Sequence, residues 1–480
     1  MPMTKTRDEQ RRDLLKKAQE VIGIPMSHID KTGRLKSGKG AIGTVIEESW
    51  FGYKPNSESE PDFPEAGLEL KVTPYIRNGK KISAKERLVC NIINYMTEYQ
   101  KTFETCDFWK KCNTMLIMSY EHKPSVDKRE FTIDKAIIFG FPKEDLEIIK
   151  QDWAKIIAKI KKGEAHLLSE GDTLYLAACT KGENSRSVRQ QPFSDIPAKQ
   201  RAYSLKTTYM TIVLNNYIFG LSKDEHIIKD LKQLEDKSFE EIIIQKLRPF
   251  YGQTISHLSL KFGVKTNAKQ IAPLLLSKML GIEGNINNTA EFKSANITCK
   301  TVKTNSKGRP EEAMSFPKFV FKEIVNEKWE TSEFKEMLET QKFLLAVFKE
   351  ISKGEYVFKG VKFWNMPLND VGKVKIVWEK TVELIKGSLE IWTNGVKTFN
   401  NFPKESANNI AHVRPHGRDS SDTDVLPDGR RLTKQCFWLN RDYIGNVISD
   451  VIKDNAQSYE FDEYETLAAA ENEIEYDSNN

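Results

Sequence analysis

The sequence predicts an α/β fold made of two tandem domains, each a mixed sheet flanked by helices. The chain has 480 residues, which is too long for one ordinary hydrophobic core. Its second half repeats the first at an offset of 229 positions, so that Gly23 falls on Gly252 and Lys71 on Lys300. Within each half, apolar strand patterns alternate with helical patterns, as is typical of α/β domains.

The repeat extends through most of each half. Glu121 falls on Glu350, and after a short gap Trp153 falls on Trp378. We therefore expect one domain at residues 1–222 and a second at 239–458, joined by a charged linker at 223–238. The tail at 459–480 is acidic, and we expect it to be disordered.

The first elements of the first domain are expected to be helices, followed by a strand. A helix is predicted over residues 42–50, because four apolar side chains share one face: Ile42, Val45, Ile46 and Trp50. A strand is predicted over 67–72. Its alternation directs Leu68, Leu70 and Val72 to one side of a sheet, and Glu69 and Lys71 to the other.

The elements that follow continue the alternation. Ser83 and Glu86 have the spacing of a capping box, which predicts that a long helix begins at Ser83. Two apolar strands, at 113–120 and 135–141, come next. They are followed by a helix through Trp153, a basic loop and a last helix.

Composition narrows the class of protein. The chain is 39% hydrophobic with a mean hydropathy of -0.53, and no run of eighteen apolar residues could span a membrane. The charged N-terminus lacks the apolar region of a secretory signal. The six cysteines are scattered without a CxxC pair, which favours a reducing cytoplasm over a disulfide or zinc framework.

The charge is unevenly distributed. The net charge is +5, but residues 460–480 hold eight acids and no base, so the rest of the chain carries +13. A basic body favours a polyanionic partner such as nucleic acid.

Two carboxylates and a lysine are grouped around the strand at 67–72. Asp62 lies seven residues before Glu69, and Lys71 follows two residues later. Taken alone, charged residues on one strand are most often its solvated face. Converging carboxylates, however, form an oxygen site suited to Mg²⁺, and a lysine beside the metal can orient water and stabilise charge on a phosphate. This combination is what phosphodiester hydrolysis requires.

The second copy supports a chemical role for these acids. At the constant offset, Asp62 becomes Glu291, Glu69 becomes Thr298 and Glu47 becomes Leu276, while only the lysine persists. Acids needed for a shared fold should have been kept. The second domain is therefore expected to lack catalysis and to bind DNA or help close the complex.

The motif Pro61-Asp62…Glu69-x-Lys71 has the form of the PD-(D/E)xK nuclease signature. Together with "GTVIEESWFG", "CTKGENSRSVRQQPFSDIPAKQRAYSLKTTYMT" and "HVRPHGRDS", the chain resembles the MutH-related type II restriction endonucleases that cut DNA at GATC. The resemblance implies tandem restriction-endonuclease-like domains and catalytic roles for Asp62, Glu69 and Lys71. It also implies a glutamate in a G-x-x-x-E helix motif, which Gly43 and Glu47 match, although the adjacent Glu48 leaves the choice open.

The basic loops are the expected DNA contacts. Residues 177–210 hold six basic residues against two acids, with Asn, Gln and Ser interleaved, and such mixtures both hold phosphates and read bases. The expected contacts are Lys181, Asn184, Ser185, Arg186, Arg189, Lys199 and Arg201 in the first domain, and Arg414, His416 and Arg418 in the second.

The sequence thus predicts a cytoplasmic, Mg²⁺-dependent endonuclease that makes double-strand cuts at GATC, with Glu47, Asp62 and Glu69 as metal ligands. Since each chain has one intact site, two chains are expected to meet on DNA as a homodimer. Two alternatives remain open from the sequence. One is a mismatch-repair nicking enzyme, and the other is a DNA-binding protein without catalysis.

Overall fold

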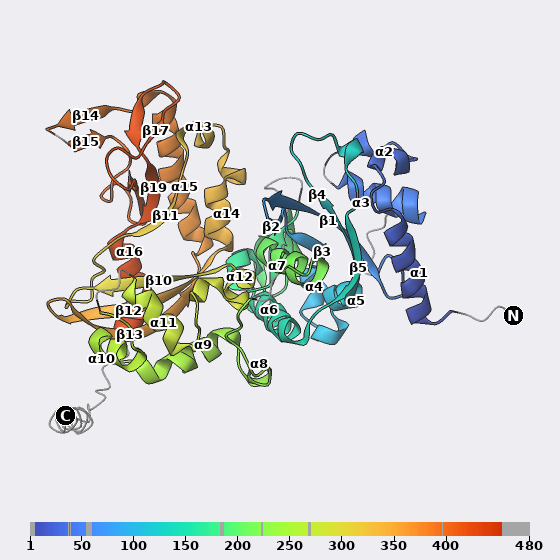
Figure 1. The fold of residues 1–480 in the computed structure, drawn as a ribbon, viewed down its shortest axis with the longest axis horizontal. Coiled ribbons are helices and arrows are strands. Elements are labelled where there is room, and N and C mark those ends of the chain that lie inside the picture. The colour runs from blue at the N-terminus through green and yellow to red at the C-terminus, as the bar shows by residue number, and fades with distance from the viewer. Residues whose placement is uncertain are drawn as a thin grey trace, which may run out of the picture.

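A computed structural model describes residues 5–36, 38, 40–53, 60–182, 187–221, 224–266, 270–395 and 397–453. The ribbon forms two lobes, one from each half of the chain, with the N-terminus on the outer side of the first lobe (Figure 1). Each lobe contains a mixed sheet, so the predicted α/β class is confirmed.

The first lobe is built on the sheet β2-β1-β4-β5, in which β1 and β4 are parallel and the other pairs antiparallel. A small antiparallel sheet β3-β9-β6 and a hairpin of β7 and β8 complete it. The strands are β1 (Glu69–Asn78), β2 (Lys81–Ala84), β3 (Leu88–Ile92), β4 (Thr114–Glu121), β5 (Lys135–Gly140), β6 (Leu176–Thr180), β7 (Val188–Gln191), β8 (Ser194–Lys199) and β9 (Arg201–Leu205). The helices are α1 (Arg7–Glu20), α2 (Met26–Ile29), α3 (Ala41–Val45) with the π-helix η2 (Ile46–Phe51), α4 (Tyr95–Glu98), α5 (Asp107–Cys112), α6 (Lys143–Lys161), and α7 (Thr207–Ile212) with the π-helix η7 (Val213–Ile218).

The second lobe follows a similar order. Its sheet β10-β12-β13 again places a parallel pair next to an antiparallel pair, and β11-β19-β16 forms a second antiparallel sheet. The strands are β10 (Ile297–Thr304), β11 (Met314–Lys318), β12 (Lys342–Ser352), β13 (Glu355–Trp364), β14 (Ile391–Asn394), β15 (Lys397–Asn400), β16 (Ala411–Pro415), β17 (Thr423–Val425), β18 (Arg431–Thr433) and β19 (Gln435–Leu439). The helices are α8 (Gln233–Asp236), α9 (Phe239–Leu247), α10 (Ile255–Phe262), α11 (Ile271–Met279), α12 (Ala290–Ala295), α13 (Phe321–Ile324), α14 (Glu333–Thr340), α15 (Leu368–Glu383), α16 (Arg441–Val447) and α17 (Ser449–Lys453).

The prediction that a long helix begins at Ser83 is wrong. Residues 81–84 form strand β2, which pairs with the end of β1, and β3 follows at Leu88. Ile82 and Ala84 are buried, and the Ala84 N–H donates to the Thr211 hydroxyl of α7. The pairing with β1 and this burial outweigh a local capping pattern, which is a weak signal by itself.

Strand β1 is longer than predicted and is covered on both faces. It begins at Glu69 and runs to Asn78, and Glu69 and Leu70 are both buried. One cluster of buried side chains packs residues of α1, α3 and η2 against Leu68 and Leu70, while Tyr75, Met115 and Ile117 belong to another cluster that includes α6 and α7. The charged side chains at the start of the strand, Glu69 and Lys71, are therefore enclosed rather than solvated.

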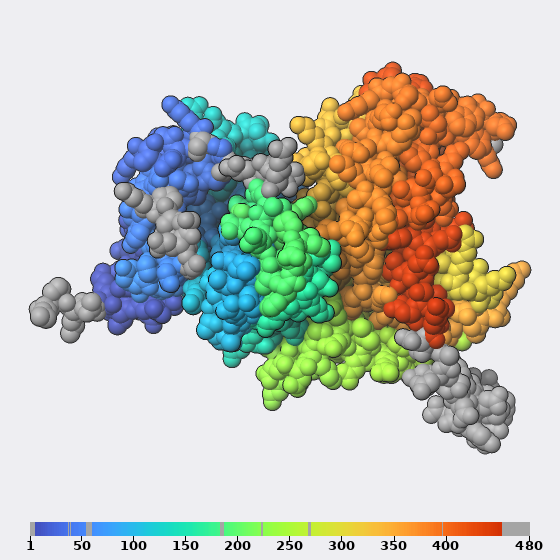
Figure 2. Space-filling view, turned by 180° about the vertical axis from the view of Figure 1, so that it is seen from behind, coloured from blue at the N-terminus to red at the C-terminus, as the bar shows by residue number. Residues whose placement is uncertain are grey.

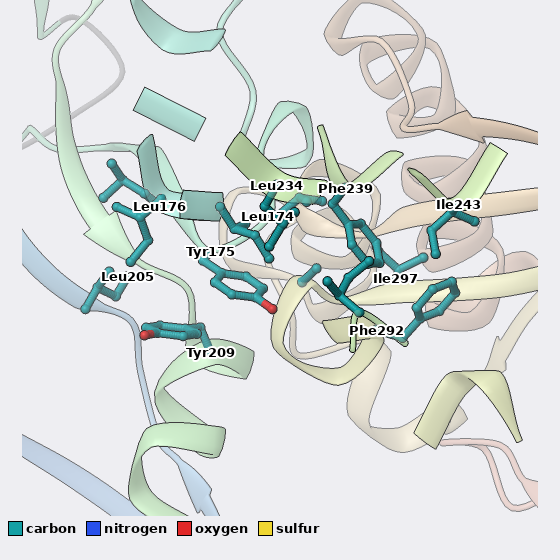
Figure 3. Close-up of a cluster of buried hydrophobic side chains, with 14 of the residues drawn as sticks. Leu174, Tyr175, Leu176, Leu205, Tyr209, Leu234, Phe239, Ile243, Phe292 and Ile297 are labelled. Atoms are coloured by element: carbon teal, nitrogen blue, oxygen red, sulfur yellow. The ribbon is translucent and has the colours of Figure 1, made fainter. Parts of the chain in front are cut away.

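The two lobes share one hydrophobic core. Leu174, Tyr175 and Tyr209 of the first lobe approach Phe239 and Phe292 of the second (Figure 3), within one continuous cluster of buried residues. The segment 224–238, within the predicted linker, contributes three buried side chains to this core: Ile227, Ile228 and Leu234. In the view from behind, the light-green chain around α8 and α9 lies at the lower edge, where the lobes meet (Figure 2).

Polar contacts reinforce this junction. Glu240 at the start of α9 accepts from Lys155 of α6 at 3.0 Å and from the buried Lys342 of β12 at 2.5 Å. The Lys342 ammonium also donates to the Asp172 carbonyl at 3.1 Å. One glutamate thus bridges lysines from both lobes.

Candidate active site

A tight turn sets the distance between Asp62 and Glu69. Phe63 and Leu68 bond each other through their backbones at 3.0 and 3.2 Å, which closes a short loop between the two acids. The Asp62 N–H donates to Glu69 Oε2 at 3.2 Å, and Asp62 Oδ2 accepts the Leu70 N–H at 3.0 Å. Each carboxylate is therefore oriented by the backbone next to the other.

Helix α1 holds this turn from outside. Arg11 donates from Nε to the Ala66 carbonyl at 2.8 Å and from Nη2 to the Gly67 carbonyl at 3.3 Å. Gly67 has a φ of 53°, a left-handed conformation that favours glycine. The guanidinium of Arg11 therefore bonds two successive carbonyls of the loop that carries Asp62.

Glu69 lies between two lysines. Its Oε1 is 2.9 Å from Lys71 Nζ and 3.7 Å from Lys111 Nζ, and only 2% of the residue is exposed. Burial raises the pKa of Glu69, and Lys71 opposes that shift. Burial alone would lower the pKa of Lys71, but the charge and hydrogen bond of Glu69 oppose that effect, and this pKa lies above its ordinary value. Lys71 is therefore a charged ammonium at neutral pH.

The two neighbouring glutamates of η2 have different surroundings. Burial raises the pKa of Glu47 to about 7, with further contributions from the charges of Asp62 and Glu69. Glu48 instead forms a bidentate pair with Arg34 at 2.8 and 2.9 Å, which lowers the pKa of Glu48. Glu47 is thus the helix carboxylate that interacts with Asp62 and Glu69.

The arrangement of Glu47, Asp62 and Glu69 determines whether they could bind a divalent cation. Over the described ranges, no three His, Cys, Asp or Glu side chains stand close enough to bind one ion as they are arranged. The reason is that Glu69 faces Lys71 and Asp62 faces a backbone N–H. Burial is the main cause of the raised pKa of Glu47, and the charges of Asp62 and Glu69 add to it. Carboxylate oxygens are the ligands that a hard cation prefers, so the donor atoms suit such an ion although their present arrangement does not assemble its site.

Among the residues that the structure describes, the corresponding place in the second lobe has no cluster of three acids. Thr298 and Lys300 of β10 occupy the positions of Glu69 and Lys71, and Leu276 is buried in α11 at the position of Glu47. The structural counterpart of Asp62 is Asn287, whose Oδ1 accepts the Cys299 N–H at 2.7 Å, as Asp62 accepts that of Leu70.

The constant offset, which paired Asp62 with Glu291, is therefore wrong at this position. Glu291 is buried in α12 and accepts the N–H groups of Ile227 and Ile228 at 3.0–3.1 Å. Helix α12 comes between Asn287 and the strand, so the two turns differ in shape and a fixed offset cannot align them.

Comparison with known proteins places this geometry in a family. The family model described as "DNA mismatch repair enzyme MutH" matches residues 51–152, which include Asp62, Glu69, Lys71 and Lys111. The chain is 38% identical to the type II restriction enzyme Sau3AI of Staphylococcus aureus over 479 residues, which cover 91% of this chain and 98% of that protein. The chain belongs to the MutH-related type II restriction endonucleases.

This restriction endonuclease is accordingly a site-specific deoxyribonuclease, and its partner is DNA. It is also 31% identical to the DNA mismatch repair protein MutH of Shewanella woodyi, over 37% of this chain and 78% of that protein. The MutH of Vibrio parahaemolyticus is 26% identical over 43% of this chain and 94% of its own length. Such relatives therefore correspond to less than half of the endonuclease.

The residues predicted to contact DNA lie in different settings. Lys181, Arg189 and Lys199 are exposed at the hairpin of β7 and β8, and Arg414 and Arg418 are exposed in the second lobe. Asn184, Ser185 and Arg186 lie outside the described residues. His416 is half-buried, with its ring 5.1 Å from that of Trp438.

Arg201 does not join the exposed group. It is 3% exposed, and its guanidinium donates to the carbonyls of Ala178 and Leu168 inside the first lobe of the endonuclease. Its observed contacts tie β9 to β6 and to the chain after α6.

Lys111 is a site residue that the sequence reasoning missed. It is 7% exposed at the end of α5 and lies 3.7 Å from Glu69. It is some forty residues from Glu69, in a stretch with no motif, and it reaches the site because α5 leads into β4, whose Met115 lies opposite Glu69 in the sheet. The only available signal was a lysine placed just before the apolar strand at 114–121.

No helix in the described part of the endonuclease is long and apolar enough to cross a membrane. The cysteines are free, and all except Cys299 are buried.

Proposed function

We propose that the first lobe, residues 1–222, is a Mg²⁺-dependent nuclease domain that cuts both strands of DNA at GATC. Residues 223–238 would connect it to a second, restriction-endonuclease-like domain at 239–458 that binds DNA without cutting. The observation that carries this proposal is the grouping of Glu47, Asp62 and Glu69 beside Lys71. The GATC assignment rests on the resemblance of the basic loops to those of this family, and the cytoplasmic location rests on the free cysteines.

Three carboxylates would hold the metal in this proposal: Asp62, Glu69 and Glu47. When bound, Mg²⁺ supplies Lewis acidity toward the phosphate and a more acidic water. The protein's part is to orient the acids. The turn at 63–68 fixes the separation of Asp62 and Glu69, and η2 brings Glu47 to them, which keeps reorganisation small.

Lys71 would act as a cation rather than a base. Its raised pKa keeps the ammonium charged at neutral pH, so it can orient a water and stabilise charge that develops on the phosphate. Lys111, which approaches the same carboxylate oxygen as Lys71, would favour the ionised form of Glu69 despite burial.

Plasmid cleavage tests this function. Supercoiled DNA with and without GATC would be incubated with Mg²⁺ and either wild-type protein, Glu69→Gln or the control Glu48→Gln. Wild type and Glu48→Gln should yield fragments ending at GATC, whereas Glu69→Gln should lose at least a thousandfold in rate and still bind the DNA. Equal cutting by Glu69→Gln would overturn the site assignment.

The form of the cleaved plasmid distinguishes a restriction enzyme from an enzyme that only nicks DNA. A restriction enzyme should convert the plasmid to linear DNA, whereas an enzyme that only nicks should accumulate open circles. Because each chain has one such site, we expect two chains to meet on the palindrome. Ultracentrifugation with and without a GATC duplex checks this, and one chain cutting both strands in a single binding event would contradict it.

A further inference from the structure

The second lobe keeps the lysine of the nuclease site but not its acids. Lys300 of β10 matches Lys71, while Asn287 and Thr298 stand where the first lobe has Asp62 and Glu69. Lys71 is paired with Glu69 at 2.9 Å. Lys300 forms no ion pair with any acid among the residues that the structure describes, and burial lowers its pKa. Without these carboxylates, the charge of Lys300 is not balanced by a described acid as the charge of Lys71 is in the first lobe.

Lys300 lines a surface pocket of about 610 Å³. The pocket lies between the start of α11, strand β10 and the second small sheet, and its walls include Gln270, Ser315, His416 and Trp438. The start of α3 and strand β1 hold the equivalent positions in the first lobe. The pocket therefore lies beside the elements of the second lobe that correspond to α3 and β1 of the first lobe.

Arg414 and His416 both contact Trp438 in the wall of this pocket. The Arg414 guanidinium stacks on the Trp438 ring at 4.7 Å, and the ring of His416 meets the same indole edge-on. The pKa of His416 is lowered by burial and by three nearby cations: Lys318, Lys300 and Arg414. Lys318 is partly neutralised by Asp422 at 3.3 Å.

Two acids also line the pocket. They are Glu311 and Glu312, and Glu311 accepts a hydrogen bond from the Tyr356 hydroxyl at 2.8 Å. Neither forms an ion pair with Lys300. The cationic side of the pocket is therefore the one that contains Lys300, with Arg414 beside it on the Trp438 ring and His416 as a neutral imidazole in the wall.

We propose that this pocket binds a backbone phosphate of duplex DNA without a metal ion, with Lys300 and the neighbouring Arg414 as its charged ligands and His416 as a neutral hydrogen-bonding ligand. The proposal rests on the proposed function and deepens it, since it says how the second lobe holds DNA. Lysine and arginine are suited to phosphate oxygens, and the Trp438 indole orients the Arg414 guanidinium that stacks on it. Glu311 and Glu312 line the pocket, but among the described residues they form no group of three metal-ligating side chains, so the phosphate is held and not cut.

The experiment uses the full chain carrying Glu69→Gln, so that DNA is bound and not cleaved. Fluorescence anisotropy with a labelled GATC duplex would be measured over a range of salt concentrations, in that background alone and with Lys300→Met added. Lys300→Met should weaken binding about three- to tenfold and reduce the salt slope by about one. The control Lys353→Met removes an exposed lysine from the β12–β13 turn, outside the pocket, and should change neither quantity.

A second variant leaves the lysine in place. Thr298→Glu restores a carboxylate at the position of Glu69, and by pairing with Lys300 it should produce the same loss of affinity. Unfolding curves identify which variants remain folded. If folded Lys300→Met and Thr298→Glu both bind DNA as tightly as the background protein, with an unchanged salt slope, the proposal is overturned. Inorganic phosphate should compete with DNA only weakly, and strong competition at micromolar concentration would assign the pocket to a free anion instead.

A failure of the phosphate-pocket proposal can be distinguished from a failure of the proposed nuclease function. Cleavage by the protein with Glu69 intact is measured on the same DNA. If that protein cuts at GATC and Lys300→Met binds normally, only the phosphate pocket is rejected. If it does not cut, the nuclease assignment itself has failed.

Discussion

At the scale of a single residue, the ionisation of Glu47 can be tested. Its pKa is raised to about 7 because the carboxyl group is partly buried and faces two other acids. In the folded, metal-free protein the charged form is therefore disfavoured. The stability associated with the neutral form is fully present below the ordinary pKa of 4.5 and is lost as the pH rises through about 7.

We predict that Glu47→Gln stabilises the metal-free protein by about 1–3 kcal/mol at pH 8 and has no effect at pH 4. Glutamine keeps the shape of the side chain but cannot ionise, so it removes a cost that exists only at high pH. Denaturant unfolding in a chelator, at the two pH values, measures the difference.

The neighbouring glutamate provides the control. The pKa of Glu48 is lowered by its pairing with Arg34, so Glu48→Gln should not stabilise the protein at pH 8. A further check is the response to metal. Added Mg²⁺ should raise the melting temperature of wild type more than that of Glu47→Gln, because only the former has three acids to bind it. Identical responses would remove Glu47 from the site.

At the scale of elements, helix α1 determines how rigidly the acids are held. Arg11 bonds the Ala66 and Gly67 carbonyls, and Phe63, Ala66 and Leu68 pack in the same buried cluster as Ala18. The turn between Asp62 and Glu69 therefore depends on a helix more than forty residues earlier in the chain.

We predict that Arg11→Ala lowers kcat about tenfold, leaves DNA affinity unchanged and raises the Mg²⁺ concentration needed for half-maximal activity. The reason is that small displacements of metal ligands cost rate without touching the DNA. Single-turnover cleavage over a Mg²⁺ titration measures all three quantities.

Arg12→Ala is a matched control, since Arg12 is adjacent and exposed and carries the same charge. It should behave as wild type. Millimolar guanidinium should partly restore Arg11→Ala by occupying the vacated position. If the two arginine variants cut at the same rate and at the same Mg²⁺ concentration, Arg11 does not position the turn.

At the scale of the whole molecule, the lobes are expected to unfold together. A continuous hydrophobic cluster crosses the junction, and Glu240 bridges Lys155 and the buried Lys342. Removing the carboxylate would leave Lys342 charged and unpaired in a buried place.

We predict that Glu240→Gln lowers the free energy of unfolding by about 3 kcal/mol and splits one thermal transition into two. Calorimetry of the full chain measures both effects. Glu235→Ala removes an exposed acid of α8 and should change the transition little. A single unsplit transition in Glu240→Gln, with unchanged stability, would show that the hydrophobic contacts alone couple the lobes.

Local sequence predicted that Asp62, Glu69 and Lys71 are grouped around one strand, and the structure places them together. The spacing of Asp62, Glu69 and Lys71 and the alternation around Leu68 and Leu70 are properties of adjacent residues, so they survive without knowledge of the fold. The strands at 114–121 and 135–140 and the helix through Trp153 also appear within a residue or two of the predicted positions. The helix expected at Ser83 failed because strand pairing with β1 decided that segment.

The sequence by itself determined the α/β class, the nuclease motif and the absence of the acids from the second half. Only the tertiary structure decided that Glu47 rather than Glu48 interacts with Asp62 and Glu69, that Lys111 joins them, and that Asn287 replaces Asp62. It also decided that Arg201 is buried and that segment 224–238 belongs to a shared core. The physical reason is the distance along the chain over which each effect acts. Periodicity and spacing act between neighbours along the chain, whereas burial, ion pairing and pKa depend on residues that only packing brings together.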